Sequence, residues 1–269
     1  MAKVVVFSGD HSRHLYVHSQ IIEIFDEVLV ICMKRENIKP LCPSDCGIND
    51  KKNFDRHFSE RFEAEFLAFG NLVPETVFSN CSLYIVTPED LCSQKICQVV
   101  ANFRPDAAFV FGCDLIKPPL LNCLPDISIN LHLGLSPWYR GSATLFWPFF
   151  MLEPQFAGVT FHMITASPDA GKIIHQETPI LEYGDKIHDV AVRCVQDSVN
   201  SARLICERIQ NQTPFKVKEQ KTTGKIWRGS DFHPAQLRVI YDLFDNNIVD
   251  AYLNGELSER TPTTYSTFS

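Results

Sequence analysis

An amide and an imidazole stand two residues apart at the end of an apolar run. Asn130 and His132 fall in the alternating pattern around residues 127–131, which predicts a β-strand. Side chains two residues apart leave a strand on the same face, so both groups point the same way. A neutral imidazole can take up a proton near pH 7, and an amide N–H can donate to a developing oxyanion. The pair suits acyl transfer; the alternative is that both groups only satisfy backbone groups at a strand end.

A carboxylate that could orient such a histidine follows later in the chain. Asp169 lies in the Ser-Pro-Asp-Ala-Gly turn at residues 167–171, directly after the apolar segment 158–164. An anion within about 4–6 Å favours the charged form of an imidazole. An aspartate in a Pro-Asp-x-Gly turn is by itself most often a turn former. Asp169 is therefore a catalytic candidate only in combination with Asn130 and His132.

The elements that must position these groups alternate between short apolar runs and longer amphipathic segments. This pattern predicts an α/β fold with a Rossmann-like, mostly parallel sheet flanked by helices. Strands are expected at residues 4–7, 28–33, 83–86, 107–111, 127–131, 158–164, 172–178 and 225–227. If one strand ends at His132, the polar pair stands at the carboxyl edge of the sheet, where open α/β proteins bind ligands.

Helices are expected between these strands. Thr87 is the expected cap of a helix over residues 88–103, and a long helix is expected to end near Ile209. A helix over residues 51–69 carries one stripe made of Phe54, Phe58, Phe62 and Phe66. Such a stripe most often docks a helix onto a sheet; stacking on a ligand is the alternative.

Composition narrows the class of protein. The chain has 269 residues, and no stretch approaches the roughly 20 apolar residues of a membrane span. The start at Met1 lacks the apolar core of a secretory signal, so a cytoplasmic protein is expected. Acidic residues outnumber basic ones by 32 to 25, so the positive field that nucleic acids require is missing. We expect neither membrane nor nucleic acid as a partner, and we expect the ten cysteines to be reduced core residues.

The pattern also divides the chain into two parts. Residues 1–210 form the expected catalytic domain, and residues 211–269 form a small C-terminal α+β extension that packs on it. The extension is too small to fold alone. It is expected to hold a helix over residues 234–244 and an apolar patch at residues 248–253. That patch indicates either a homodimer or docking on the parent domain.

Several motifs recur together. Asn-x-His is followed by Leu-x-Pro-x-x-Arg-Gly and later by a Gly-Val-Thr strand before an Asp-x-Gly turn. They lie at residues 130–132, 135–141, 158–160 and 169–171. As a set they resemble the 10-formyltetrahydrofolate-dependent formyltransferases, over roughly residues 1–205. The resemblance implies that Asn130, His132 and Asp169 are the catalytic trio. The chain departs at residues 134–136, Gly-Leu-Ser, where many members read Ser-Leu-Leu.

The resemblance also implies where the two substrates bind, without a metal. The implied residues for 10-formyltetrahydrofolate are Gly112, Cys113, Asp114, Leu115, Ile116, Ile164 and Thr165. Taken alone, Cys113 and Ile116 would be assigned to the core. The implied substrate-binding residues are Ser12, Arg13, Trp138, Tyr139 and Arg140. Residues 8–13 resemble the phosphate-binding turn of the purine enzyme in this family, but Asp10 and His11 stand where that enzyme is glycine-rich.

Members of that family formylate different amines, and they differ in the part of the chain that follows the catalytic core. The tRNA enzyme has a sizeable C-terminal barrel and a basic surface, and the purine enzyme usually stops near the end of the core. Residues 130–148 and 227–253 look similar to sugar N-formyltransferases instead. The expected acceptor is a nucleotide-linked amino sugar for a cell-surface polysaccharide such as O-antigen. The alternatives are a methionyl-tRNA or other small-amine formyltransferase, and a non-catalytic folate- or sugar-nucleotide-binding module.

Two other chemistries have partial motifs. Gly134-Leu135-Ser136 begins a serine-hydrolase nucleophile elbow, but Trp138 stands where the motif needs glycine. Metal binding by Cys42 and Cys46, or by His11 and His14, lacks the usual four-ligand spacing. Neither motif is complete.

Overall fold

A seven-stranded sheet forms the centre of the computed structural model, which describes residues 2–37, 39–221 and 224–268. Its order is β3-β2-β1-β4-β5-β7-β8. The strands are β1 (Lys3–Gly9), β2 (Glu27–Met33), β3 (Ser82–Val86), β4 (Ala107–Phe111), β5 (Ile127–His132), β7 (Val159–Met163) and β8 (Ile173–Glu177). Strands β1 to β5 run parallel, whereas β7 and β8 are antiparallel to their neighbours. The predicted α/β fold with a mostly parallel sheet is confirmed.

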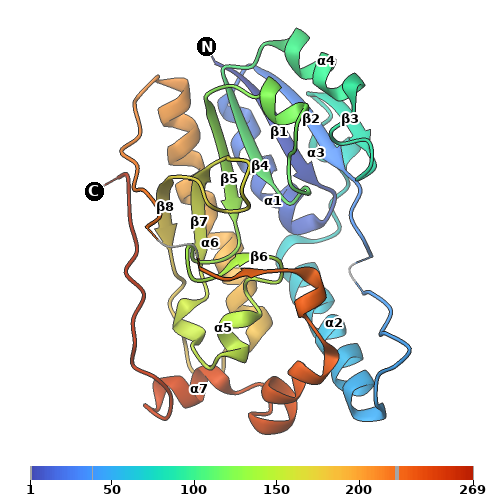
Figure 1. The fold of residues 1–269 in the computed structure, drawn as a ribbon, viewed down its shortest axis with the longest axis vertical. Coiled ribbons are helices and arrows are strands. Elements are labelled where there is room, and N and C mark those ends of the chain that lie inside the picture. Colours follow the sequence, from blue (N-terminus) through green and yellow to red (C-terminus); the bar gives the residue numbers. More distant parts are fainter. Residues whose placement is uncertain (1, 38, 222–223, 269) are drawn as a thin grey trace.

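Helices cover both faces of this sheet (Figure 1). On one face α1 (Ser12–Ile21) packs against α6 (Ile187–Gln210), and α2 (Ile48–Phe69) packs against both. On the other face α4 (Gln94–Phe103) packs against a 3₁₀ turn, Leu120–Cys123. The shorter helices are α3 (Pro74–Val77), α5 (Trp147–Phe150) and α7 (Ile248–Leu253). The strands are apolar on both sides because both of their faces are covered.

Helix α4 begins later than the sequence predicts. Its first residue is Gln94 rather than Pro88, because the Ser93 side chain caps the helix by accepting the N–H of Ile96. Thr87 instead accepts the N–H of Asp90 in a turn that precedes the helix. The residues after Thr87 form a turn, so the helix begins only at the next capping hydroxyl, that of Ser93.

The C-terminal extension packs on the core and reaches the carboxyl edge of the sheet (Figure 1). Its strand β9 (Ile226–Trp227) pairs with β6 (Arg140–Gly141), and Trp227 stacks on Trp147 with ring centroids 4.0 Å apart. The helix expected over residues 234–244 is a 3₁₀ turn, Pro234–Gln236, followed by a π-helical segment, Val239–Leu243. Within α7, Ile248, Val249 and Ala251 are buried in the chain itself, so this patch docks on the parent domain; a homodimer stays a prediction.

Two predictions about the whole chain can be compared with the structure. Within the described ranges, no helix combines the length and the apolar character needed to cross a bilayer. All ten cysteines are free thiols, but only Cys32, Cys97, Cys194 and Cys206 are buried. The others are half-buried, so the assignment of all ten to the core was wrong for those six.

Candidate active site

A cavity of about 1370 Å³ opens at the carboxyl ends of the parallel strands. Binding sites for one small molecule typically measure about 300–1,000 Å³, so there is room for more than one ligand. Its walls come from the segments after β1, β4, β5 and β7, from helices α2 and α6, and from the C-terminal extension. This is the sheet edge at which the sequence predicts the site.

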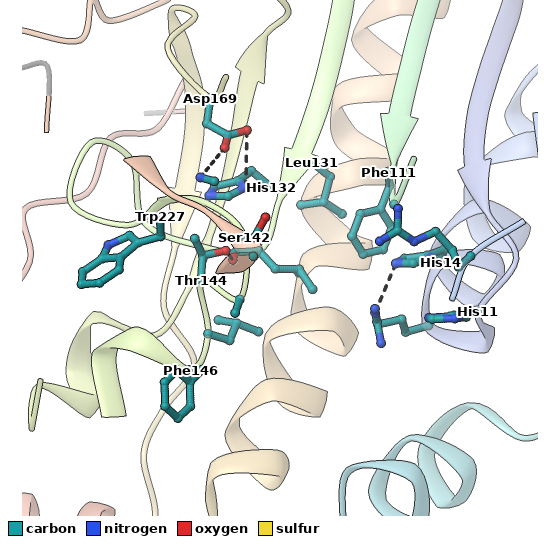
Figure 2. Close-up of a pocket in the computed structure, with 18 of the residues that line it drawn as sticks. His11, His14, Phe111, Leu131, His132, Ser142, Thr144, Phe146, Asp169 and Trp227 are labelled. Atoms are coloured by element: carbon teal, nitrogen blue, oxygen red, sulfur yellow. Dashed lines mark hydrogen bonds and ion pairs between the residues drawn. The ribbon is translucent and has the colours of Figure 1, made fainter. Parts of the chain in front are cut away.

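Strands β5 and β7 bring the predicted trio together at one end of the cavity. The antiparallel register sets Asn130 opposite His162, and His132 lies two residues beyond Asn130 on the same face. His132 Nδ1 lies 3.5 Å from Asp169 Oδ1, and His162 Nε2 lies 3.4 Å from the same oxygen (Figure 2). We call the group formed by Asn130, His132, His162 and Asp169 the reaction end.

The Asp169 carboxylate is held by the backbone of β6. Gly141 N–H donates to Asp169 Oδ2 at 2.7 Å. Gly141 has a φ of +98°, and a Cβ there would lie 2.0 Å from the Trp227 carbonyl oxygen, so only glycine fits. Burial raises the pKa of Asp169, but His132, His162 and the Gly141 N–H outweigh it and hold that pKa well below its ordinary value. Asp169 is therefore ionised at neutral pH.

His132 is a buried imidazole with an acceptor at each ring nitrogen. Nε2 donates to the Tyr139 carbonyl at 2.9 Å, and Nδ1 faces Asp169. Burial lowers the pKa of His132, while Asp169 and the Tyr139 carbonyl act in the opposite direction. Asp169 favours the charged ring, as expected from the sequence, but burial is the larger effect. His132 is therefore mainly neutral at pH 7, with its proton on Nε2 and with Nδ1 able to take a second proton beside Asp169.

His162 is a fourth side chain that sequence reasoning missed. Its Nδ1 donates to the Met163 carbonyl at 2.9 Å, which leaves Nε2 to accept from Asn130 Nδ2 at 3.1 Å. This hydrogen bond directs the Asn130 amide nitrogen toward His162 and leaves its second N–H for the cavity. The only signal in the sequence is a histidine in the strand before the Asp169 turn. Its importance follows from the pairing of β5 with β7, which local pattern does not reveal.

The predicted folate-binding residues form a wall beside the reaction end. All seven line the cavity: Gly112, Cys113, Asp114, Leu115, Ile116, Ile164 and Thr165. Within the described chain, the N–H groups of residues 113–116 donate no hydrogen bond, and Leu115 is 40% exposed. Free backbone donors beside apolar side chains fit a flat heteroaromatic ring such as a pterin. Burial raises the pKa of Cys113 to about 12, so its thiol stays protonated.

The predicted substrate-binding residues lie in different places. Arg13 lines the cavity. The described lining does not include Ser12, Trp138, Tyr139 or Arg140. Ser12 accepts the N–H of Leu72, and the Tyr139 hydroxyl donates to Glu153. Trp138 packs edge-on against Phe156, and the Arg140 guanidinium donates to the Pro168 carbonyl behind the Asp169 turn. These four support the walls, and direct contact with a substrate stays a prediction for them.

The rival motifs do not form sites in the fold. Ser136 is fully buried, and its hydroxyl donates to the Asp169 carbonyl oxygen rather than to a histidine. In the part of the chain that the structure describes, no three histidine, cysteine, aspartate or glutamate side chains are grouped so that they could hold a metal ion. The reaction end therefore remains the chemically equipped site.

Comparisons with known proteins show the family of the chain. Residues 67–209, just over half of the chain, match the family model described as formyl transferase. A methionyl-tRNA formyltransferase from Thermodesulfovibrio yellowstonii is 28% identical over 147 residues, which are 54% of this chain and only 46% of that protein.

Solved structures show the same fold at low identity. An N-formyltransferase from Helicobacter canadensis, crystallised with folinic acid and dTDP-3-aminofucose, has a TM-score of 0.53 and 20% identity, covering 87% of this chain and 73% of that one. A glycinamide ribonucleotide transformylase from Symbiobacterium toebii has a TM-score of 0.54 and 16% identity, covering 82% and 95%. From the family match over residues 67–209, the chain belongs to the formyl transferase family.

Proposed function

We propose that this chain moves a formyl group from 10-formyltetrahydrofolate to the amine of a nucleotide-linked amino sugar. The observation that carries the proposal is the reaction end itself: an amide, two imidazoles and an ionised carboxylate meet beside a wall that fits a pterin. When bound against residues 112–116, the folate supplies the formyl group. The chain's own residues must then stabilise charge and move one proton.

Asn130 is positioned to stabilise negative charge. As the amine adds to the formyl carbon, charge develops on the formyl oxygen, and an aligned N–H donor is worth most at that stage. The Asn130 amide has one N–H committed to His162 and one left for the cavity. We therefore assign the oxyanion contact to Asn130 Nδ2.

His132 and Asp169 are positioned to carry the proton. The amine loses a proton when it becomes an amide, and the folate nitrogen must gain one when it leaves. A neutral His132 already donates its Nε2 proton to the Tyr139 carbonyl, so it takes the first proton on Nδ1, where the Asp169 carboxylate stabilises the charged ring. Burial disfavours the charged ring, so the same proton passes on readily to the departing nitrogen. No covalent enzyme intermediate is needed.

The acceptor is assigned from three observations. The cavity of about 1370 Å³ is larger than one folate-sized site requires. Residues 226–229 of the C-terminal extension line it, so the extension takes part in the site. The structurally similar Helicobacter canadensis protein was crystallised with a dTDP-linked amino sugar. The methionyl-tRNA enzyme among the relatives supports a second candidate, but a net charge of −7 gives no field to attract tRNA.

A product screen tests this proposal. The protein is incubated with 10-formyltetrahydrofolate and a panel of amino-sugar nucleotides, and products are read by mass spectrometry. We expect one panel member to gain one formyl group, with an equal amount of tetrahydrofolate released, and we expect the Asp169→Asn variant to lose this activity. Formylation of methionyl-tRNA or of glycinamide ribonucleotide, with no panel member modified, would contradict the assignment.

A further inference from the structure

The cavity has a second polar end, which the trio does not use. It lies where α1, α2 and α6 approach one another, and we call the group Arg13, His14, Arg61, Glu65 and His188 the arginine end. In Figure 2, His11 and His14 lie across the pocket from His132 and Asp169, with Phe111 between the two sides. Of this group, the sequence motifs include only Arg13, as a substrate-binding residue, and His14, as a metal ligand.

Two guanidinium groups share one carboxylate at the arginine end. Arg13 Nη1 donates to both oxygens of Glu65, at 2.7 and 3.0 Å, and Arg61 Nε donates to Glu65 Oε1 at 2.9 Å. The three side chains are only 14%, 25% and 12% exposed. Two positive charges and one negative charge leave a surplus of one positive charge. Charges that are mostly buried are normally paired, so this group lacks one anion.

The arginines also keep donors free. Among the described residues, the two terminal nitrogens of Arg61 and Nη2 of Arg13 have no hydrogen-bond partner. Arg61 and Arg13 both line the cavity. The planar fork of a guanidinium matches the two oxygens of a carboxylate or a phosphate. The missing anion can therefore be reached from inside the cavity.

Nearby groups do not cancel the surplus charge. The third arginine of this wall, Arg35, pairs with Asp114 at 2.7 Å and with Glu36 at 2.9 Å. These two carboxylates outnumber Arg35, but both are more than half exposed, so water screens their charge. Burial lowers the pKa of His14 well below its ordinary value and lowers the pKa of His188 to about 3, so both rings are neutral at pH 7. The local positive charge thus comes from Arg13 and Arg61 alone.

The titration of the group reflects the same imbalance. Burial, and then Arg61, lower the pKa of Arg13 to about 10. Burial raises the pKa of Glu65, but the two arginines outweigh it and bring that pKa down to about 2. One carboxylate stays fully ionised and still does not relieve the repulsion between the guanidinium groups.

We propose that the arginine end binds an oxyanion of the acceptor, a phosphate or a carboxylate, with Arg61 as the residue that decides specificity. The inference rests on the proposed function and deepens it, because it places the acceptor's anionic part opposite its amine. Two unpartnered buried nitrogens belong to neutral rings that line the same cavity, His11 Nδ1 and His188 Nε2. These suit hydroxyl or N–H groups next to the oxyanion.

Equilibrium binding tests the site without any formyl transfer. Calorimetry at fixed ionic strength, in a buffer free of phosphate and carboxylate, measures dTDP, inorganic phosphate and acetate. We expect dTDP or one of the two simple anions to bind the unmodified protein, and the probe that binds identifies the oxyanion. In Arg61→Met the dissociation constant should rise at least tenfold, since charge-assisted hydrogen bonds are lost. Arg61→Lys keeps the positive charge but lacks the planar guanidinium, so its dissociation constant should lie between those of the unmodified protein and Arg61→Met.

Arg56→Met is the matched control. Arg56 lies on the same helix, pairs with Glu60 and Asp245 outside the cavity, and should leave the dissociation constant within twofold. Folinic acid binding should be unchanged in every variant. If Arg61→Met loses folinic acid binding, the dissociation constants of the probe for Arg61→Lys and for the unmodified protein are compared instead, and equal values overturn the proposal. The proposal is overturned if no probe binds the unmodified protein, or if Arg61→Met binds as tightly.

The outcomes also separate this site from the proposed function. Binding of dTDP that depends on Arg61, without formylation of any amino-sugar nucleotide, supports the anion site and contradicts the proposed function. Formylation by Arg61→Met with an unchanged KM for the acceptor supports the function and overturns the anion site.

Discussion

The two ends of the cavity differ in charge and in construction. At the reaction end the charge that faces the cavity belongs to the Asp169 carboxylate, with the Arg140 guanidinium behind its turn. At the arginine end, Arg13 and Arg61 outnumber Glu65. An acceptor with an amine at one end and an oxyanion at the other would complement both.

The two ends are also held differently. Backbone groups fix the reaction end: the Gly141 N–H holds Asp169, the Tyr139 carbonyl holds His132 and the Met163 carbonyl holds His162. The arginine end is held mainly by side chains on α1 and α2 that bind one another. Backbone contacts persist when side chains change.

The largest expected effect is at the reaction end. In Asn130→Ala the oxyanion loses one donor, which typically lowers the rate by about 100- to 1,000-fold. The kcat for formyl transfer should fall by that order, while the dissociation constant for folinic acid stays unchanged. Asn122→Ala, a change at an exposed asparagine, is the control and should have no effect. Equal turnover in Asn130→Ala would remove this residue from the chemistry.

The backbone support of the reaction end predicts a large effect on stability. Gly141→Ala places a Cβ 2.0 Å from the Trp227 carbonyl oxygen, so β9 must shift. Gly184 has a similar φ, +91°, with nothing within 4 Å of a Cβ, and it is the matched control. We expect urea unfolding to show a loss of about 1–2 kcal/mol for Gly184→Ala and at least about 3 kcal/mol for Gly141→Ala. Equal losses would show that this contact is not tight.

A pair of histidine variants compares the two ends in kinetic terms. His162→Phe removes the partner of the Asn130 amide, so kcat should fall about tenfold with little change in the KM for the acceptor. His188→Phe removes an unpartnered acceptor at the arginine end, so the KM for the acceptor should rise several-fold with kcat nearly unchanged. Steady-state kinetics with varied acceptor measures both. The opposite pattern would exchange the roles of the two ends.

A separate effect, on stability rather than on activity, is a dependence on pH. Burial lowers the pKa of His18 to about 4 and that of His188 to about 3, below the roughly 6.5 of an unfolded histidine. Between these values the unfolded chain binds more protons, so the free energy of unfolding falls as the pH drops below about 6.5. Each histidine contributes about 1.4 kcal/mol per pH unit in that window.

Urea unfolding between pH 7 and pH 5 measures this slope. His18→Leu should flatten it by the contribution of one histidine, whereas His233→Gln, at an exposed position, should leave it unchanged. A slope that is the same in all three proteins would show that His18 is not a buried neutral ring.

The sequence predicted the reaction end better than the arginine end. Asn130 and His132 share one strand and Asp169 follows the neighbouring one, so local motifs indicate all three positions. Arg13 and Arg61 come from helices that meet only in the folded chain. No short-range pattern can show that they share one carboxylate.

The phenylalanine stripe predicts helix α2 but not the charged residues of that helix that line the cavity. The stripe predicted helix α2 correctly, but the helix packs mainly on α6, α1 and the 3₁₀ turn Pro234–Gln236 rather than on the sheet, and only Phe54 is buried, whereas Phe66 is 51% exposed. The stripe therefore docks at only one end of the helix. The apolar stripe gives no sign of the roles of Arg61 and Glu65 on the same helix, because charged residues on a helix normally face solvent.

The central claim is that one acceptor spans the cavity, with its amine beside Asn130 and His132. A crystal structure of the protein with folinic acid and a dTDP-linked amino sugar tests this most directly. We predict the sugar nitrogen within hydrogen-bond distance of the Asn130–His132 pair and a phosphate oxygen on the Arg61 guanidinium. An amine that lies far from both side chains, with the pterin bound elsewhere than against residues 112–116, would contradict the account.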